Sequence, residues 1–279
     1  MNLYGDLPRL SCPVCGEGQD RTRQFWRIPF GYLSTSVIVN NGMTDTAPIL
    51  VGDNAVCYQY TRCDCCKSIY LDPYNSQTAQ EYSTSDRYCK MLRESENWAG
   101  YEAQYTAWIH PYLNEKTTAI LDAGCGAGCY LRLAHHDPSV PNLKFLIGLE
   151  LSGPIIAQLA KLYQEPFYFY QLDLTAQNFI GHPKEDPLGV PKDFIILSEV
   201  FEHIQFPDIA LSNLWGTLTI GGHLFMTAQS TTGGLPIRPA EPIYTSHTGI
   251  MMLINSLERS RIVRMEEISG RWKIVMTKQ

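Results

Sequence analysis

The chain has 279 residues, 44% of them hydrophobic, and a formal net charge of −6. This length and apolar content allow one large domain with a sizeable core and a second, smaller one. The acidic balance argues against a broad nucleic-acid-binding face, although it leaves room for a local basic patch. The sequence has neither an apolar run of about eighteen residues nor a signal peptide at residues 1–10, so we expect a cytoplasmic protein without a membrane span.

Two C-x-x-C pairs mark the N-terminal region, Cys12 with Cys15 and Cys63 with Cys66. Two such pairs can place four thiolates at the corners of a tetrahedron around zinc. The chain has nine cysteines and no secretion signal, which favours reduced thiols and metal over disulfides. We therefore predict a structural zinc site in a zinc-ribbon-like segment, residues 1–75, with unrelated buried thiols as the alternative.

The second pair differs from the first in two ways. It carries Lys67 where the first pair is followed by Gly16, and it contains an additional thiol, Cys65. The sequence therefore leaves open whether Cys65 or Cys66 completes the metal site. Between the pairs, apolar and polar residues alternate around the apolar residues 37–39 and 49–51, and we expect strands there.

A glycine-rich turn follows the next predicted strand. The apolar run at 118–121 ends on Asp122. Glycines then occupy alternate positions, at Gly124, Gly126 and Gly128, and a helical pattern begins directly after them. A strand, a glycine turn and a helix in this order are typical of nucleotide-binding α/β folds. Glycine is required because a side chain would hold the backbone away from the ligand and because tight turns can demand a positive φ.

The details of this turn distinguish between cofactors. A dinucleotide-binding fingerprint would place its third glycine where the chain has Cys129. Asp122 would repel a pyrophosphate, but it suits the amine end of an amino acid. The segment resembles motif I of the class I S-adenosylmethionine (SAM) methyltransferases. This resemblance implies SAM as cofactor, with contacts from Asp122, Gly124, Cys125 and Gly126.

Further strand candidates follow in the order of that family. They lie at residues 143–150, 167–172, 193–198 and 223–228, with a closing hairpin of 262–268 and 272–276 around Ser269 and Gly270. The resemblance covers the chain from about residue 105 onward. It implies an α/β fold with a seven-stranded Rossmann-like sheet, strand seven antiparallel, in a methyltransferase domain at 116–279.

The same resemblance assigns residues at the ends of these strands. Glu150 would take both ribose hydroxyls, because a carboxylate has two acceptor oxygens for a cis-diol, and Leu151 would adjoin it. Asp173 and Leu174 would contact the adenine, and Ser198 would lie at the end of the fourth strand. Plain structural roles remain possible for each of the acids.

A helical segment is predicted at 74–113, forming a lid or linker at 76–115. The resemblance implies that this helix covers the cofactor and that one of its tyrosines contacts the methionine end. The tyrosines available are Tyr82, Tyr88, Tyr101 and Tyr105.

The catalytic candidates Glu199, Glu202 and His203 follow the fourth strand. On a helix, positions i, i+3 and i+4 share one face. His203 could act as general base, oriented by a glutamate, on a hydroxyl that attacks the sulfonium methyl. Alternatively the three could bind a divalent cation with His247, since E-x-x-E-H resembles segments of small-RNA 2′-O-methyltransferases and ubiquinone-pathway O-methyltransferases. A structural role is the third possibility.

Together these features predict a SAM-dependent methyltransferase acting on a small molecule at oxygen, with His203 as candidate general base. One alternative is an RNA or modified-nucleotide methyltransferase using a metal site of Glu199, Glu202, His203 and His247. Another is a non-catalytic SAM-binding scaffold protein. The sequence names neither the methyl acceptor nor the oligomeric state.

Overall fold

The computed structural model describes residues 11–16, 22–28, 58–72, 98–176, 186–232 and 243–279. The strands expected at 37–39 and 49–51 lie outside these residues, as do Tyr82 and Tyr88. Within the described part, no helix is long and apolar enough to cross a membrane.

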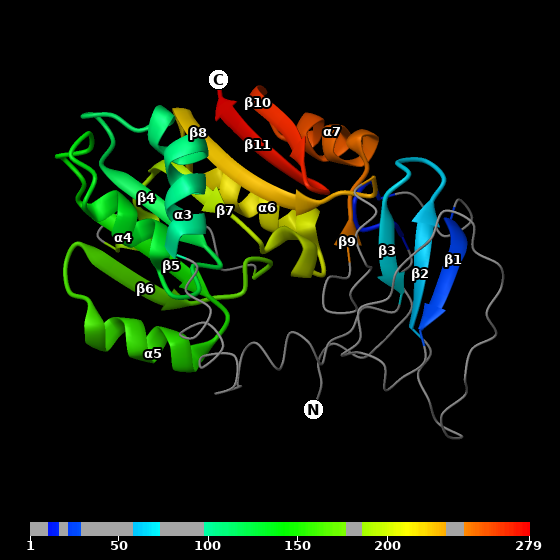
Figure 1. Ribbon diagram of the computed structural model, residues 1–279, viewed down its shortest axis with the longest axis horizontal. Helices are drawn as coiled ribbons and strands as arrows, with labels where there is room; N and C mark the ends of the chain where they lie inside the picture. The colour runs from blue at the N-terminus through cyan, green and yellow to red at the C-terminus, as the bar shows by residue number, and fades with distance from the viewer. Residues whose placement is uncertain (1–10, 17–21, 29–57, 73–97, 177–185, 233–242) are drawn as a thin grey trace.

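A seven-stranded sheet forms the larger part of the molecule (Figure 1). Its strand order is β10-β11-β8-β7-β4-β5-β6. The strands are β4 (Ala119–Ala123), β5 (Phe145–Glu150), β6 (Phe167–Gln171), β7 (Lys192–Leu197), β8 (Leu218–Gln229), β10 (Ser260–Ile268) and β11 (Arg271–Lys278). Strands β6, β5, β4, β7 and β8 pair in parallel, whereas β11 runs antiparallel between β8 and β10. This is the predicted sheet, with its seventh strand antiparallel.

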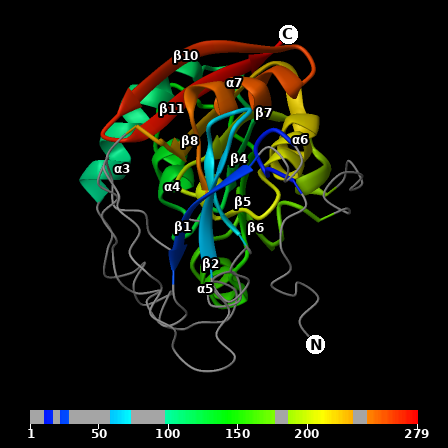
Figure 2. The same cartoon turned by 90° about the vertical axis from the view of Figure 1, so that its right-hand side faces the viewer.

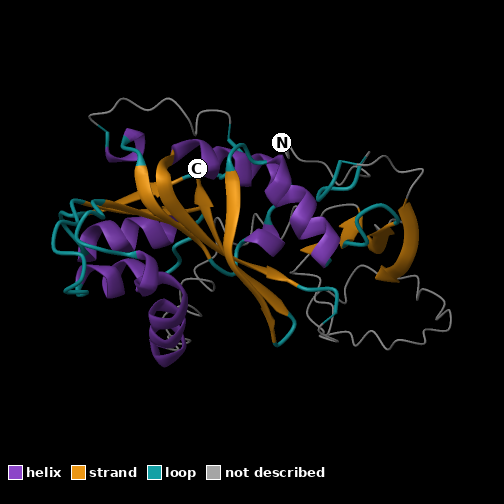
Figure 3. Cartoon of the chain, turned by 90° about the horizontal axis from the view of Figure 1, so that it is seen from above, coloured by secondary structure: helices purple, strands orange, loops and turns teal. Residues whose placement is uncertain are grey.

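Burial of both sheet faces explains why the central strands are continuously apolar. All five residues of β4 are buried. Helices α3 (Trp98–Gln104) and α4 (Cys129–His135) contribute to one core cluster, and α6 (Pro207–Thr217) and α7 (His247–Ser256) to the other. Figure 3 shows helices on both faces of the large sheet. Helix α5 (Gly153–Leu162) packs beside β6.

A two-residue turn connects β10 and β11 in the closing hairpin. Ser269 and Gly270 have φ values of 52° and 76°, as a two-residue turn with both central residues left-handed requires. Residues 98–112 form the described part of the predicted helical segment, as α3, a π-helical turn (Tyr105–Ile109) and a 3₁₀ turn (His110–Tyr112).

A second sheet of four strands stands beside the first in Figure 1 and faces the viewer in Figure 2. It contains β1 (Thr22–Ile28), β2 (Tyr58–Cys63), β3 (Ile69–Asp72) and, at its edge, β9 (Ile243–Tyr244). Strand β9 belongs to the segment predicted as the methyltransferase domain, 116–279. The small sheet therefore draws on both the first and the last of the three predicted segments, and 1–75 does not form it alone.

Hydrogen bonds at the start of α7 join the two sheets. Backbone N–H of Ser246 donates to Ser68 Oγ at 3.2 Å, and the Ser246 hydroxyl donates to the carbonyl oxygen of Cys66. Gly249 lies so close that a Cβ there would fall 2.2 Å from Ser68 Oγ and 2.9 Å from Val14. The cysteine region consequently packs into the same hydrophobic core as the underside of the large sheet.

Candidate active site and cysteine cluster

The glycine turn after β4 has the backbone that its sequence predicts. Gly124, Gly126 and Gly128 have φ values of 76°, 50° and 73°. A Cβ at Gly124 would also fall 2.3 Å from a methyl carbon of Val200, so space and backbone both require glycine there. Cys125 is buried, and its sulfur would lie 2.8 Å from a Cβ on Gly148.

Asp122 ends β4 in an unusual environment for a carboxyl group. It is 2% exposed, and its Oδ2 has no hydrogen-bond partner among the described residues. Burial, and secondly the nearby Glu150, raise the pKa of Asp122 to about 8. An isolated buried carboxylate is costly unless a cation or hydrogen-bond donor satisfies it. The chain provides no such donor for Oδ2 in the part described, which marks the position as a place for a ligand's cationic group.

Glu150 ends the neighbouring strand β5 and is held by backbone donors. Its Oε1 accepts N–H groups from Leu151 at 2.8 Å and Ser152 at 3.1 Å, and its Oε2 accepts from Gly126 at 3.1 Å. Burial raises the pKa of Glu150, while these three hydrogen bonds oppose that effect. The bond from Gly126 also ties the glycine turn to β5, so the two predicted cofactor positions lie side by side.

The two residues predicted to contact the adenine, Asp173 and Leu174, differ in their exposure to solvent. Asp173 is exposed, and its Oδ1 accepts from both the backbone N–H and the hydroxyl of Thr175, at 2.8 and 2.7 Å. Leu174 is buried in the core below the large sheet. Asp173 thus stabilises its own turn, and one of its carboxylate oxygens is engaged in doing so.

The expectation that Glu199, Glu202 and His203 share one helical face is wrong. Glu199 has a φ of 59°, Phe201–His203 form a single 3₁₀ turn, and the helix begins only at Pro207. The helical spacing argument fails because the segment does not follow the 3.6-residue period.

These three side chains have different surroundings. Glu199 forms an ion pair with Arg271 and accepts a hydrogen bond from Thr227. Glu202 is buried, and Gln229 donates to it at 3.4 Å. His203 is half-buried at the end of the turn.

The metal arrangement expected for this segment is also not formed. His247 is exposed at the first position of α7, with its ring 5.7 Å from that of Trp272. Among the described residues, one group of three or more potential metal ligands is found, and it consists of cysteines. Glu199, Glu202, His203 and His247 are not brought together as a cation site.

Sequence reasoning missed a polar network beside the glycine turn. Gln104 on α3 donates through Nε2 to Tyr130 Oη at 2.6 Å and to Ser198 Oγ at 2.8 Å. Its Oε1 accepts from Lys273 Nζ at 3.0 Å. These residues come from α3, α4, the end of β7 and β11, and only Ser198 adjoins a recognisable motif. The one available signal is the interruption of an apolar strand pattern by Lys273.

The four predicted zinc ligands form a compact cluster. The Sγ atoms of Cys12, Cys15, Cys63 and Cys66 all lie within 4.8 Å of one another. Two of the sulfur–sulfur distances are 3.7 Å (Cys12–Cys66) and 3.6 Å (Cys15–Cys63). A tetrahedral zinc with bonds of about 2.3 Å separates its sulfurs by about 3.8 Å, so the donor set fits this metal.

The turns of the two cysteine pairs are equivalent despite their different sequences. Gly16 N–H bonds to the Cys12 carbonyl and Lys67 N–H to that of Cys63, both at 2.9 Å. Gly16 and Lys67 have φ values of 75° and 62°. Lys67 therefore adopts the left-handed conformation that glycine takes in the first pair. The cluster includes Cys66 and leaves out Cys65, so its geometry favours Cys66 as the fourth ligand.

Sequence comparison finds a methyltransferase domain in the part of the chain that forms the large sheet. A family model described as a methyltransferase domain matches residues 121–224. The mitochondrial ubiquinone biosynthesis O-methyltransferase of Candida albicans is 27% identical over 117 residues. That match takes in 41% of this chain and spans about a third of the relative's length, 33%.

Two solved structures share the fold. A putative S-adenosylmethionine-dependent methyltransferase from Listeria monocytogenes has a TM-score of 0.51 at 14% identity, over 65% of this chain and 99% of that one. A chain in the complex of the Haloferax volcanii Trm112 methyltransferase activator with a putative methyltransferase has a TM-score of 0.53 at 13% identity, over 72% of this chain and 97% of that one. With its strand order, its glycine turn and the matching family model, the chain contains a methyltransferase domain, and its large sheet has the fold of SAM-dependent methyltransferases.

Proposed function

We propose that the protein transfers the methyl group of SAM to an oxygen atom of a small-molecule acceptor. The observation that carries the cofactor half of this proposal is the buried Asp122 carboxyl, whose Oδ2 has no donor in the described chain and which lies directly before the glycine turn. The ammonium group of SAM would supply both the missing donor and the missing positive charge.

Other residues of the chain fit the remaining parts of SAM. Glu150 uses its two oxygens for three backbone donors, which leaves acceptor capacity for a ribose hydroxyl. Gly124, Gly126 and Gly128 allow the backbone to approach the cofactor closely. When bound, SAM supplies an electrophilic methyl group on a sulfonium, and the protein's task is to hold an acceptor atom in line with it.

Oxygen as the accepting atom is supported by the similarity to a ubiquinone biosynthesis O-methyltransferase. His203 lies half-buried after β7 and is our candidate for the base that takes the hydroxyl proton. If it has this role, His203→Gln lowers kcat and removes the acid limb of the pH–rate profile. An unchanged profile would exclude His203 as the base.

Calorimetric titration with SAM tests the cofactor proposal. Asp122→Asn replaces the carboxyl group, which can ionise against the ammonium of SAM, by an amide of nearly the same volume, and we expect SAM affinity to fall by about tenfold or more. Glu258→Gln is the matched control, because it removes one carboxylate whose side chain is 85% exposed. Equal SAM affinity in Asp122→Asn and wild type would overturn the assignment, and absence of SAM binding to wild type would overturn the function.

The cysteine cluster is the natural site for a structural zinc ion. All four positions around the metal would be filled by thiolates, as in closed structural sites, and none would be left for a substrate. Its attachment to Ser246 and Gly249 gives the metal a role in fixing β9 and the start of α7. The alternative of an RNA methyltransferase with a metal site at Glu199, Glu202, His203 and His247 is less well supported, because these described residues do not form a cation site.

A further inference from the structure

Adjacent strands of the large sheet place polar side chains in one row at the carboxyl edge. Ile196, Phe225 and Val275 pair across β7, β8 and β11 and belong to the apolar core under α3 and α4. Two residues closer to the edge, on the same face, the row continues with Ser198, Thr227 and Lys273. The pairing of Thr227 with Lys273 is direct. The apolar face of the sheet thus ends in a polar border beside the glycine turn.

Lys273 is the unusual member of this row. It is half-buried, and its ammonium donates to Gln104, a neutral amide, at 3.0 Å. Among the described residues it has no ion pair with a carboxylate within 4.0 Å. Burial lowers the pKa of Lys273; Arg271 and Arg264 add to this effect, while Glu199 and Glu266 oppose it. A partly desolvated cation with a neutral partner can be stabilised by an anionic ligand.

Because Gln104 donates to both Tyr130 and Ser198, one of these two hydroxyl groups can donate its hydrogen to an anionic ligand. Gln104 Nε2 donates to the oxygens of both Tyr130 and Ser198, which are 3.3 Å apart. Of these two hydroxyls one can donate to the other, so the second has its proton free to point outward. Burial keeps the pKa of Tyr130 well above its ordinary value, so this residue stays a donor. The network presents a cation and a hydroxyl donor side by side.

Charges of both signs surround Lys273, with Arg271 and Arg264 as the cations and Glu199 and Glu266 as the carboxylates. Arg271 stands two residues before Lys273 on β11 and carries the ion pair to Glu199, with side chains 34% and 42% exposed. Glu199 is held in place by Thr227, which accepts from its N–H at 2.7 Å, and it has a left-handed φ of 59°. Strain of this kind in a non-glycine residue is typical of functional positions. Arg271 pairs with Glu199 and Arg264 with Glu266, so among the described residues Lys273 is the cation of this group without a carboxylate partner, and an anionic ligand would supply one.

We propose that Lys273, with Arg271 and the Gln104–Tyr130–Ser198 network, binds a carboxylate of the methyl acceptor, so that the enzyme's substrates are hydroxy acids rather than neutral alcohols. This inference rests on the proposed methyltransferase function, because it assigns the acceptor side of the same site. In this arrangement Glu199 competes with the substrate carboxylate for Arg271. The substrate therefore enters by exchanging one anion partner of Arg271 for another.

Benzoate and benzamide test this subsite, because they share a shape and differ in charge. Calorimetric titration is carried out on the full chain saturated with S-adenosylhomocysteine. We expect saturable binding of benzoate and at least about tenfold weaker binding of benzamide. Lys273→Met should weaken benzoate binding about tenfold, whereas Glu199→Gln should strengthen it several-fold, because Arg271 is released. Opposite signs for the two variants cannot come from general destabilisation.

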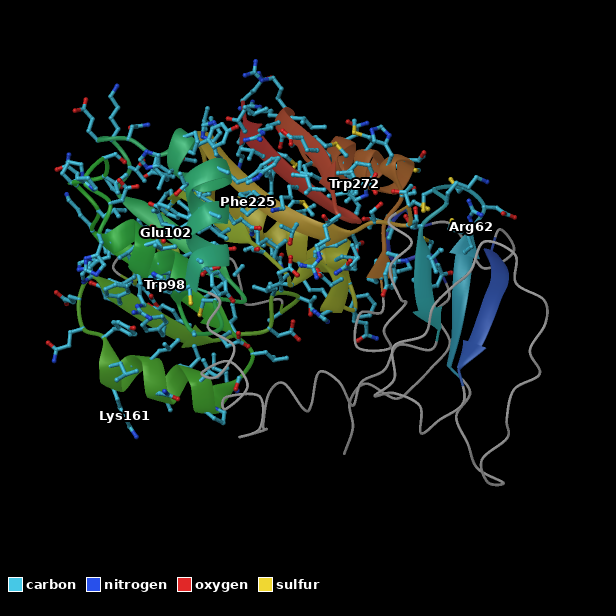
Figure 4. The ribbon with its side chains drawn as sticks, in the orientation of Figure 1. Arg62, Trp98, Glu102, Lys161, Phe225 and Trp272 are labelled. Carbon is cyan, nitrogen blue, oxygen red and sulfur yellow. The ribbon has the colours of Figure 1, made fainter. Side chains whose placement is uncertain are left out.

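Lys161→Met is the control, since it removes one cation from the exposed surface of α5, away from the network (Figure 4). Failure of benzoate to bind saturably, or equal binding by wild type and Lys273→Met, overturns the subsite. The preceding titration with S-adenosylhomocysteine reports separately on the proposed function. Binding of the cofactor product without binding of benzoate leaves the methyltransferase assignment intact and rejects the hydroxy-acid specificity.

Discussion

The cysteine cluster and the carboxyl edge of the large sheet are both polar sites, but they differ in completeness. The four thiols come from two equivalent turns and lie within reach of one another and of a single ion. At the carboxyl edge, Asp122 has an oxygen without a described donor and Lys273 has a neutral partner. A cluster in which every donor atom faces one ion is typical of a structural metal site, whereas charged groups without protein partners are typical of a ligand-binding site.

The two sites are also mechanically connected. Ser246 bonds to the backbone of Cys66 and caps α7 through Gly249 N–H at 2.9 Å. Trp272, the neighbour of Arg271 and Lys273, donates from its indole N–H to the Thr245 carbonyl at 3.0 Å. The cysteine cluster thus supports β11, the strand that carries Arg271 and Lys273.

The largest effect is expected from breaking the cluster. Cys66→Ser should abolish stoichiometric metal binding and lower the free energy of unfolding by about 4 kcal/mol or more, as loss of a metal site does. Elemental analysis and denaturant unfolding measure the two effects. Cys65→Ser is the matched control, being the same change one residue away and outside the cluster. Retention of metal by Cys66→Ser would show that another ligand completes the site.

Asp122 at the carboxyl edge of the large sheet should make the stability of the protein depend on pH. The pKa of Asp122 is about 8 in the folded protein without cofactor, against an ordinary value of 3.8. Between these values the folded state keeps a proton that the unfolded state has lost, so the Asp122 contribution makes stability fall as pH rises through this range and level off above about pH 8.

Unfolding of wild type and Asp122→Asn, compared from pH 5 to pH 9 by denaturant titration, isolates this contribution, because all other groups titrate in both proteins. Relative to wild type, Asp122→Asn should gain stability as pH rises, by a few kcal/mol at most. A difference between the two proteins that does not depend on pH would show that Asp122 is ionised in the cofactor-free fold.

The smallest effect tests the equivalence of the two cysteine turns. Lys67 pays the cost of a left-handed backbone at a position where the first pair has glycine. Lys67→Gly should therefore raise the free energy of unfolding by about 1 kcal/mol, with metal binding unchanged. Lys67→Ala keeps a Cβ and should bring no such gain. Equal stabilities of the Gly and Ala variants would mean that the turn is not strained.

The sequence alone determined the features that local rules govern. The alternation of glycines after Asp122, the apolar parallel strands and the Ser269–Gly270 turn each follow from backbone sterics and burial, and the structure confirms them. The pairing of C-x-x-C motifs predicted a four-thiol cluster because the spacing fixes each pair's turn.

Only the tertiary structure decided which distant residues meet. The helical spacing assumed for Glu199 and His203 failed, because a buried Phe201 and a pairing with Arg271, far along the chain, shape that segment instead. Nothing near Lys273 in sequence indicates Gln104 or Ser198 as its neighbours, and nothing near Cys66 indicates Ser246. Local patterns encode local geometry, but contacts between distant segments depend on how the sheets pack, which no single segment contains.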